Sequence, residues 1–279
     1  MRVIILGSGG FIASSVEKKL KKKKINVVSF SRNKLDLTKS NSHKKLKKII
    51  KKKKYFFFAS AKDPVKNINM LIYNLQMLKS VSDGIDPLKI KKFIYLSSDA
   101  VYADTKKKIT ENSIISSDNL HGQMHRTREI YFEEIFKNKI CIIRPTLVFG
   151  PEDPHNGYGP NKFIRDAKNN NFINLFGKGE ERRDHIFIDD LSYLISEIIT
   201  KNFFGKINLA TGKINSFYKI AKCVLSVKRE NNKIIYLKRQ GPMPHLGMRS
   251  FDIKKLKNMF PNYKFVSINK IIKDVLEKY

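Results

Sequence analysis

Two histidines stand one helical turn apart in the stretch SDNLHGQMHRTRE, residues 117–129. On a helix, His121 and His125 would project from one face, with Arg128 and Glu129 directly after them. Histidine exchanges protons near neutral pH, ordinarily around pH 6.5, and it is also a common metal ligand. Three kinds of site therefore remain open for this pair: a metal site, two buried structural histidines, or an acid/base pair in an active site.

A metal site needs ligands that the local spacing does not supply. Helices that bind zinc through an H-x-x-x-H pair carry glutamate directly after the first histidine, whereas Gly122 follows His121 here. The spacing fixes no third ligand either. We therefore predict that the pair holds no metal, and buried structural histidines stay open as the alternative to an acid/base role.

A second group of polar residues follows an apolar run. The stretch KKFIYLSSDAVY, residues 91–102, ends in Ser97, Ser98 and Asp99 before the next loop begins. In open α/β sheets, ligands bind at the carboxyl ends of the strands. The sequence therefore predicts hydroxyls and a carboxylate at the ligand-binding edge of a sheet.

The elements that must position these residues alternate between strands and helices. Apolar runs of strand length occur in RVIIL near the start and at 25–30, 55–61, 91–98 and 139–145, with helical periodicity between them. This alternation predicts an α/β fold with a doubly wound parallel (Rossmann) sheet. The Pro- and Gly-rich stretch RPTLVFGPEDPHNGYGP marks a change of domain. We predict a nucleotide-binding domain over 1–150 and a smaller substrate-binding domain over 151–279, partly interleaved with the first.

A glycine cluster follows the first strand in a G-x-x-G-x-x-A spacing. Gly7 permits a tight turn, Gly10 lets the N-terminus of a helix approach a pyrophosphate, and Ala13 lets that helix pack closely. A simple tight turn is the alternative for the glycines taken alone. Because strands and helices alternate after it, we predict a dinucleotide site that includes Gly7, Gly10, Phe11 and Ile12.

Arg32 follows the second strand, where an acidic residue would hold the adenosine ribose. An arginine at this place can accept a 2′-phosphate, so NADP is favoured over NAD, although an exposed loop arginine is the alternative. Asp36 and Leu37 are predicted to flank the adenine. Ala59 and Ser60 are predicted to contact the cofactor from the end of the third strand.

These motifs together resemble the extended short-chain dehydrogenase/reductases, in the NAD-dependent epimerase/dehydratase family that modifies nucleotide-linked sugars. The resemblance runs through nearly the whole sequence, in the glycine turn, Asn74, SSDAVY, RPTLVFGP, NKFI, LFGKGEERRDHIFIDDL, NLATG and MRSFDIKKL. It implies that Ser98 is catalytic and hydrogen-bonds the reacting oxygen, and that Asp99 stands where dehydratases carry an acid. Ala100 stands where they carry a second acid, which weakens the dehydratase interpretation.

The catalytic Y-x-x-x-K pair of that family corresponds here to His121 and His125. Glu129 follows where a glutamate is common in the family, which supports the frame. The resemblance implies that His121 exchanges a proton with the sugar and that His125 holds the nicotinamide ribose. A Y-x-x-x-K string at 102–106 lies in a loop and is interpreted as a chance match. A cofactor-binding protein without turnover is the alternative function.

The resemblance assigns the substrate to the second half of the chain. Asn161, Arg183 and Arg249 are implied to bind the diphosphate of a nucleotide sugar, and arginine forks suit phosphate oxygens. Asp184 and Asp189 are interpreted as structural, because a carboxylate beside a diphosphate would repel it. We predict an epimerase or a 4-keto reductase in surface-polysaccharide precursor synthesis. A homodimer formed through 66–82 and 119–138 is also implied.

Lysine runs at 18–24 and 44–54 contribute to a formal net charge of +31. Apolar stripes within both runs predict the outer faces of amphipathic helices, and no aromatic platform is interleaved, so we predict no specific nucleic-acid partner. The sequence shows neither an apolar run near the ~20 residues of a membrane span nor a signal-peptide pattern, so a cytoplasmic protein without a membrane partner is expected. Cys141 and Cys223 are predicted to be buried thiols.

Overall fold

The computed structural model describes residues 1–50, 54–169, 172–227 and 233–278. The chain forms two compact units. Unit 1 comprises Met1–Ala103, Ser113–Pro145 and Leu191–Asn208, and unit 2 comprises Asp104–Asn112, Thr146–Asp190 and Leu209–Tyr279. Neither unit is one continuous segment, and the chain passes between them several times.

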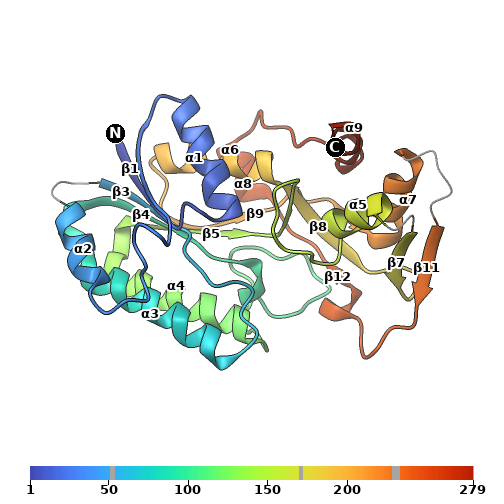
Figure 1. The fold of residues 1–279 in the computed structure, drawn as a ribbon, viewed down its shortest axis with the longest axis horizontal. Coiled ribbons are helices and arrows are strands. Elements are labelled where there is room, and N and C mark those ends of the chain that lie inside the picture. The colour runs from blue at the N-terminus through green and yellow to red at the C-terminus, as the bar shows by residue number, and fades with distance from the viewer. Residues whose placement is uncertain (51–53, 170–171, 228–232, 279) are drawn as a thin grey trace. The chain divides into compact units, whose positions relative to one another are not determined.

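A six-stranded sheet forms the centre of unit 1 (Figure 1). Its strands lie in the order β2 (Asn26–Phe30), β1 (Arg2–Leu6), β3 (Lys54–Phe58), β4 (Ile90–Leu96), β5 (Ile140–Pro145) and β9 (Gly205–Leu209). The pairs from β2 to β5 are parallel, and Leu6 at the end of β1 is in register with Phe30 on β2 and Phe58 on β3. The predicted parallel α/β sheet is confirmed.

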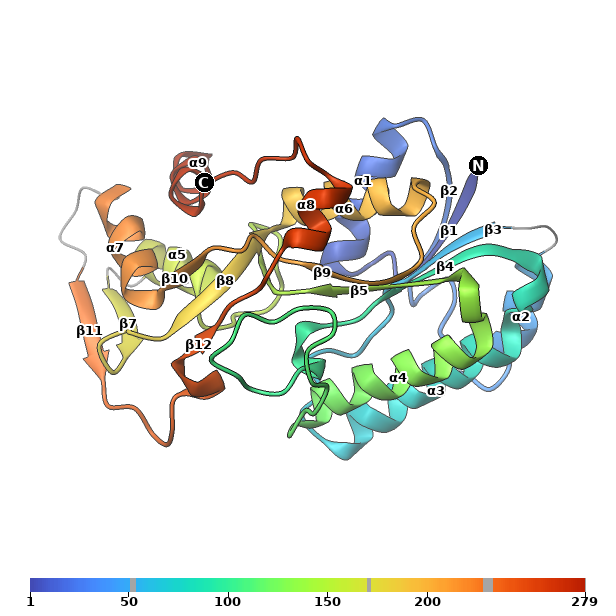
Figure 2. The same ribbon diagram turned by 180° about the vertical axis from the view of Figure 1, so that it is seen from behind.

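Helices cover both faces of this sheet (Figure 2). They are α1 (Phe11–Lys22), α2 (Ser42–Ile49), α3 (Ile68–Gly84), α4 (Leu120–Phe136) and α6 (Ile188–Thr200). Helices α2, α3 and α4 lie on one face, and α1 and α6 lie on the other. Between the sheet and α4, the rings of Phe93 and Phe136 stack with centroids 4.0 Å apart, and Phe132 packs against Phe58. This aromatic core holds α4 against the strands that end in the polar residues.

The two lysine runs lie on helix exteriors, as their stripes predict. In α1, Ala13, Val16 and Leu20 are buried while the lysines face outward. In the second run, Leu46 is buried in α2 and Ile50 is buried directly after it. Residues 51–53 of that run lie outside the described part of the chain. In both helices the apolar stripe, and not the charge, determines how the helix packs.

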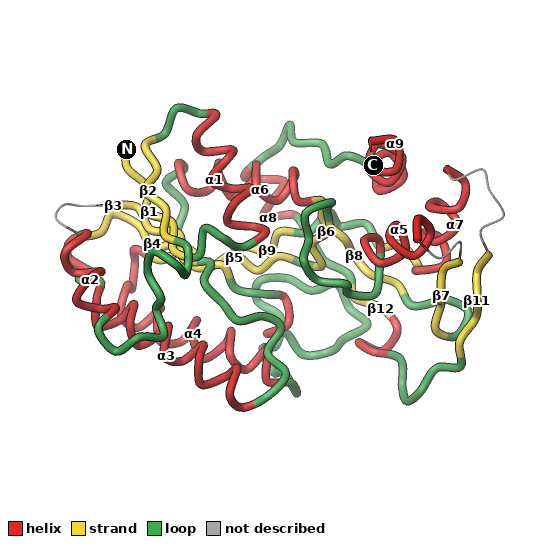
Figure 3. Tube along the Cα trace, viewed as in Figure 1, coloured by secondary structure: helices red, strands yellow, loops and turns green. Residues whose placement is uncertain are grey.

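Among its described residues, unit 2 contains two small sheets and four α-helices. Figure 3 colours the strands yellow and the helices red. The strands are β6 (Leu147–Phe149), β7 (Phe172–Phe176), β8 (Arg182–Phe187), β10 (Ile214–Ser216), β11 (Lys233–Leu237) and β12 (Met248–Arg249). The helices are α5 (Pro160–Asn169), α7 (Phe217–Val227), α8 (Lys254–Met259) and α9 (Ile268–Lys278). Strand β8 pairs with β6, β10 and β12, and β7 pairs with β11. Phe163, Phe217 and Ile272 lie in a core shared by α5, α7 and α9.

Within the described residues, the model contains no helix of the length and hydropathy that crossing a bilayer requires.

Candidate active site

The glycine turn joins the end of β1 to the start of α1. Gly7 has φ +96°, and a Cβ added there would lie 2.7 Å from the backbone nitrogen of Ser60, so glycine alone fits without strain. Gly10 is the N-cap of α1, and among the described residues no side chain caps this helix and no acid stands in its first turn. Its first N–H groups therefore suit an anion. The turn also lies where strand order reverses between β1 and β3, so this region fits a dinucleotide.

Arg32 is the second residue after β2, and its side chain is 70% exposed. Its Nε lies 3.5 Å from Asp36 Oδ2, so an acid stands beside the guanidinium. Asp36 accepts hydrogen bonds from the Thr38 backbone N–H and hydroxyl, and the hydroxyl bond is the main cause that lowers the pKa of this carboxyl. Leu37 is 4% exposed and packs in the core, which leaves little of its side chain for an adenine.

The segment after β3 connects the glycine turn with α4. Ser60 lies against Gly7, and its carbonyl accepts a hydrogen bond of 2.9 Å from Arg128 Nη1 on α4. Asn74 on α3 accepts from the Lys62 backbone N–H and donates to the Lys62 carbonyl. Arg128 Nη2 in turn donates to Asn74 Oδ1 at 2.9 Å. Two buried side chains therefore hold this segment beside α4.

Ser98 and Asp99 follow β4, at the sheet edge that the sequence predicts. Ser98 is the N-cap of a short 3-10 turn, Asp99–Val101, and its Oγ accepts from the Ala100 N–H at 3.2 Å. This leaves the hydroxyl proton of Ser98 available as a donor. The neighbouring Ser97 hydroxyl instead donates to Glu129 Oε1 at 2.7 Å. The two serines therefore differ in role. The Ser97 hydroxyl is used in a hydrogen bond that supports the fold, whereas Ser98 is half-buried at the edge of the sheet.

The histidine pair lies in the first two turns of α4. Asn119 caps this helix by accepting from the Gly122 N–H at 2.9 Å. A Cβ on Gly122 would lie 2.1 Å from the Ala100 carbonyl, so glycine lets α4 pack directly on the segment after Ser98. The His121 and His125 rings are perpendicular, with centroids 4.7 Å apart. The structure thus brings the predicted serine and histidine segments together.

The two histidines differ in their surroundings. The His121 side chain is 20% exposed, and its Nδ1 lies 3.1 Å from Asp63 Oδ1. His125 is 4% exposed, and its Nδ1 lies 2.7 Å from the Tyr95 hydroxyl. Burial holds the pKa of His125 well below its ordinary value, and the nearby His121 and Arg128 add to the effect. His125 is therefore a neutral ring with one nitrogen engaged, whereas His121 is accessible.

Glu129 forms a buried ion pair at the base of this site. Its carboxylate accepts from Arg144 Nε at 2.8 Å and Nη2 at 2.6 Å, and both side chains are fully buried. Burial lowers the pKa of Arg144, but the hydrogen bonds and charge of Glu129 outweigh burial and raise it overall. The ion pair ties α4 to β5 beneath the histidines, and loss of one partner of such a pair typically costs roughly 3–5 kcal/mol.

The Y-x-x-x-K string at 102–106 has no catalytic geometry. The Tyr102 hydroxyl donates to Asn208 Oδ1 at 2.7 Å and accepts from Arg144 Nη1 at 2.8 Å. Because Tyr102 is buried and its hydroxyl bonds to these two side chains, we interpret it as structural.

The sequence did not predict three residues of this site, which are Asp63, Tyr95 and Arg128. Arg128 is the partner of Ser60 and Asn74. Only Asp63 carried a usable signal, because it follows β3 closely at the carboxyl edge of the sheet. Tyr95 reads as an ordinary strand residue and Arg128 as a surface helix residue. Their roles depend on which side chains pack opposite them.

The two predicted substrate arginines lie side by side in unit 2. Arg183 on β8 is in register with Arg249 on β12, in a parallel pair. Arg183 is ion-paired with Glu181 and donates to the Pro244 carbonyl at 2.8 Å. Arg249 lies 3.2 Å from Asp104. Each guanidinium contacts a carboxylate, and the diphosphate contact implied for both arginines stays a prediction.

Asn161 and Asp184 are both bonded within unit 2. Asn161, near the start of α5, accepts from the Gly150 N–H at 3.1 Å and donates to Asp153 Oδ2 at 2.5 Å. Both ends of its amide therefore hold the loop before α5, and the diphosphate contact implied for it stays a prediction. Asp184 accepts from the Thr211 and Gly212 backbone N–H groups, which is a structural role.

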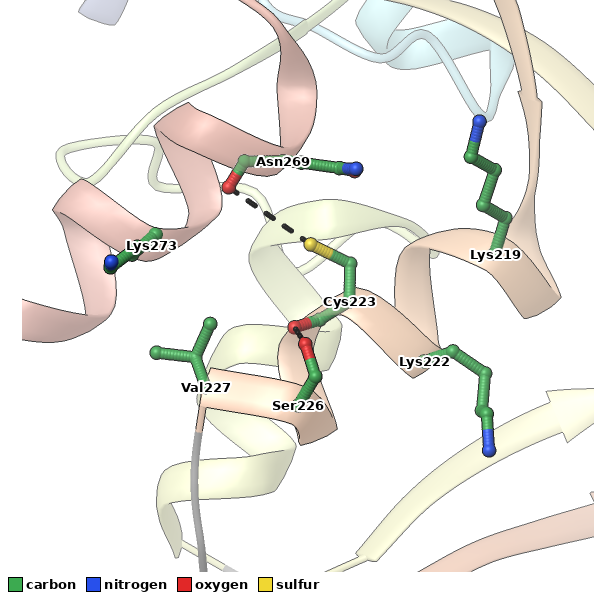
Figure 4. Close-up of a pocket in the computed structure, with 7 residues that line it drawn as sticks. All are labelled: Lys219, Lys222, Cys223, Ser226, Val227, Asn269 and Lys273. Atoms are coloured by element: carbon green, nitrogen blue, oxygen red, sulfur yellow. Dashed lines mark hydrogen bonds between the residues drawn. The ribbon is translucent and has the colours of Figure 1, made fainter.

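A basic pocket lies elsewhere in unit 2, between α7 and α9 (Figure 4). Its lining residues are Lys219, Lys222, Cys223, Ser226, Val227, Asn269 and Lys273. Cys223 is half-buried, so the prediction of a buried thiol is wrong for it and right for Cys141. Burial raises the pKa of the Cys223 thiol, which disfavours the nucleophilic thiolate. None of the predicted site residues lines this pocket.

Sequence relatives include a dTDP-D-glucose 4,6-dehydratase of Dictyostelium discoideum, which is 29% identical over 157 residues. That match spans 50% of this chain and only 36% of that protein. An uncharacterized UDP-glucose epimerase of Bacillus subtilis is 24% identical, over 72% of this chain and 73% of the relative. The second match therefore covers most of the length of both proteins.

Among solved structures, UDP-glucose 4-epimerase of Thermotoga maritima with UDP-glucose superposes with a TM-score of 0.81. The match covers 99% of this chain and 98% of that one at 20% identity, so it shows a common fold. The family model described as "NAD dependent epimerase/dehydratase family" matches residues 3–210. This match includes the glycine turn, the serine segment and the histidine pair, and the chain therefore belongs to the NAD dependent epimerase/dehydratase family.

Proposed function

We propose that this protein is an NAD(P)-dependent oxidoreductase of a nucleotide-activated sugar, acting as an epimerase or a 4-keto reductase in surface-polysaccharide precursor synthesis. One observation carries the proposal: Ser60 lies against Gly7 and is bonded to α4 through Arg128, so one segment links the dinucleotide turn with the histidine helix. The epimerase names of the Bacillus and Thermotoga proteins support the substrate class.

The residues that would hold the dinucleotide are those of the turn and the adjacent strand ends. The Gly10 N–H donates to the Gly7 carbonyl, so the backbone N–H groups of Phe11 and Ile12, at the N-terminus of α1, would hold the pyrophosphate. Arg32 extends into solvent, where it can bind a 2′-phosphate, which favours NADP over NAD. Contacts with the cofactor are also proposed for Asp36, Leu37 and Ala59. When bound, the cofactor supplies the hydride acceptor or donor.

His121 is proposed as the proton-transfer residue. A neutral imidazole can take the proton of a sugar hydroxyl as hydride leaves the same carbon, and return it in the reverse step. Ser98 donates its hydroxyl proton to the reacting oxygen, since its Oγ already accepts from Ala100. His125 is proposed to position the nicotinamide ribose through Nε2, because Tyr95 engages Nδ1. Asp99 lies at the same edge as a further acid.

Substrate binding is proposed for Asn161, Arg183 and Arg249. The adjacent arginines offer two forked donors to a diphosphate, which would replace their contacts with Glu181 and Asp104.

A panel of nucleotide sugars tests the function. Purified protein is incubated with NADPH, NADP or NAD and each UDP-, GDP- or dTDP-sugar, and hydride transfer and epimer formation are followed by absorbance and NMR. We expect turnover of at least one sugar. Binding of cofactor without any turnover would instead support the second candidate, a cofactor-binding protein, which the burial of His125 and its bond to Tyr95 favour.

A homodimer is proposed through α3 and α4. Ile72 and Tyr73 on α3 and Ile130 and Tyr131 on α4 are large apolar side chains that unit 1 leaves exposed. Exposed apolar side chains on two helices that pack against each other support an interface there. Light scattering should give a dimer mass for the wild type and a monomer mass for Ile130→Glu, and a wild-type monomer would exclude this interface.

A further inference from the structure

Three side chains of the types that ligate metals converge at the start of α4. Asp63, His121 and His125 each present one ligand atom, and these atoms lie within 4.8 Å of one another. His121 Nδ1 and Asp63 Oδ1 are already 3.1 Å apart. Among the described residues, this is the one group of three such side chains arranged in this way. The third ligand that the local spacing of the histidines does not supply comes from the segment after β3.

The backbone next to Asp63 is fixed before any ligand binds. Asn74 bonds to both the N–H and the carbonyl of Lys62, at 3.1 and 3.0 Å. Asn74 is fully buried and is itself held by Arg128. The Asp63 side chain is 44% exposed, which provides an entry path and freedom to rotate. The cluster therefore combines a hydrogen-bonded backbone with one exposed ligand side chain.

His125 has the orientation of a metal ligand. The Tyr95 hydroxyl, 2.7 Å from Nδ1, leaves Nε2 for an ion. Ligand imidazoles in proteins are generally oriented by such a partner on the second ring nitrogen.

Arg128 is the main opposing charge near the cluster. Its guanidinium donates to the Ser60 carbonyl, the Asn74 carbonyl and Asn74 Oδ1, at 2.7–2.9 Å. These acceptors offset part of its charge.

We propose that Asp63, His121 and His125 form a binding site for one divalent late transition-metal ion of the zinc class. Two imidazoles and one carboxylate suit such ions, whereas Mg²⁺ and Ca²⁺ prefer oxygen ligands throughout. Bond lengths of about 2.0–2.2 Å place tetrahedral ligand atoms about 3.3 Å apart, so the cluster must contract. Rotation of Asp63 and His121, both partly exposed, provides that contraction.

Occupancy of this site excludes proton transfer by His121. Coordination uses the lone pair with which the imidazole would accept a proton, so the metal-loaded protein should be inactive. The expected inactivity of the metal-loaded protein rests on the proposed function, whereas metal binding rests on the geometry alone.

Metal binding is tested on the full chain without cofactor or substrate. Chelator-treated protein is titrated with Co²⁺, followed by visible absorption, and with Zn²⁺ against a chromophoric chelator. We expect one ion per chain, and at least tenfold weaker binding for Asp63→Asn and His121→Gln, whose side chains are partly exposed and tolerate change. Tyr95→Phe should weaken binding about tenfold, because it removes the partner that orients His125.

His155→Gln is the matched control, because it removes an exposed histidine of unit 2. It should bind metal as the wild type does. Wild-type protein that binds no ion, or an Asp63→Asn variant that binds as tightly as the wild type, overturns the site and leaves the proposed function untouched. If the site binds Zn²⁺ but the loaded protein turns over substrate at the full rate, the exclusion clause and the proton-transfer role of His121 fail while the site stands.

Discussion

The glycine turn and the histidine cluster lie in the same unit and share the segment after β3, but they are built from different groups. The turn presents backbone N–H groups, held by the positive φ of Gly7 and the start of α1. The cluster presents the side chains of Asp63, His121 and His125, held by Asn74, Arg128 and Tyr95. A backbone site depends on a few glycines, whereas a side-chain site depends on every partner that orients it.

The largest expected effect separates the two regions by function. His121→Ala should lower turnover by about 10²–10⁴-fold, the usual contribution of a general acid/base, while cofactor affinity stays near that of the wild type. Steady-state kinetics on a sugar that the wild type converts, with calorimetric titration of NADP, would measure both quantities. Full activity in the variant would remove His121 from the mechanism.

Gly7→Ala should instead affect the glycine turn, and with it stability and cofactor binding. The methyl group would lie within 3.0 Å of the Ser60 backbone at a positive φ, so we expect a stability loss of roughly 2–5 kcal/mol and at least tenfold weaker cofactor binding. Gly9→Ala is the control, because its Cβ would make only an ordinary 3.6 Å contact with Ser31. Chemical denaturation should show a lower free energy of unfolding, and calorimetry a weaker cofactor affinity, for Gly7→Ala but not for Gly9→Ala. If the two variants gave equal values, the close contact between Gly7 and Ser60 would not be what requires glycine.

A buried histidine outside the cluster sharpens the contrast with His121. Burial lowers the pKa of His185 to about 3. Below pH 6.5 the unfolded chain binds a proton that the native ring does not, so the stability that neutral His185 provides is lost as pH falls from about 6.5 towards 3. From pH 7 to pH 5 the wild type should lose about 2 kcal/mol more than His185→Gln. Urea unfolding followed by circular dichroism measures this, and parallel pH curves would refute it.

The smallest expected effect concerns the preference for NADP over NAD at Arg32, beside the glycine turn. Arg32→Ala should weaken NADP binding about tenfold and leave NAD binding unchanged, because only the 2′-phosphate would meet the guanidinium. Asp36→Asn is the complementary variant, since it removes the acid beside Arg32 and should strengthen NADP binding slightly. Calorimetric titration with both cofactors compares them, and equal NADP and NAD affinities in the wild type would exclude the preference.

The sequence by itself determined the parallel sheet, the glycine turn and the places of Ser98, His121 and His125. These features follow from local rules, because apolar runs form strands and a tight turn with a positive φ requires glycine. The convergence of Arg183 and Arg249 was predicted through the family resemblance, and the register of β8 and β12 places them side by side.

Only the tertiary structure decided what surrounds the histidines. Asp63 faces His121 because Asn74 and Arg128, from two helices, hold the segment after β3, and no local spacing encodes that contact. His125 is buried against Tyr95 because aromatic packing presses α4 onto β4. Side-chain chemistry depends on desolvation and on neighbours from distant segments, so the same two histidines acquire one accessible ring and one neutral buried ring only when the chain is folded.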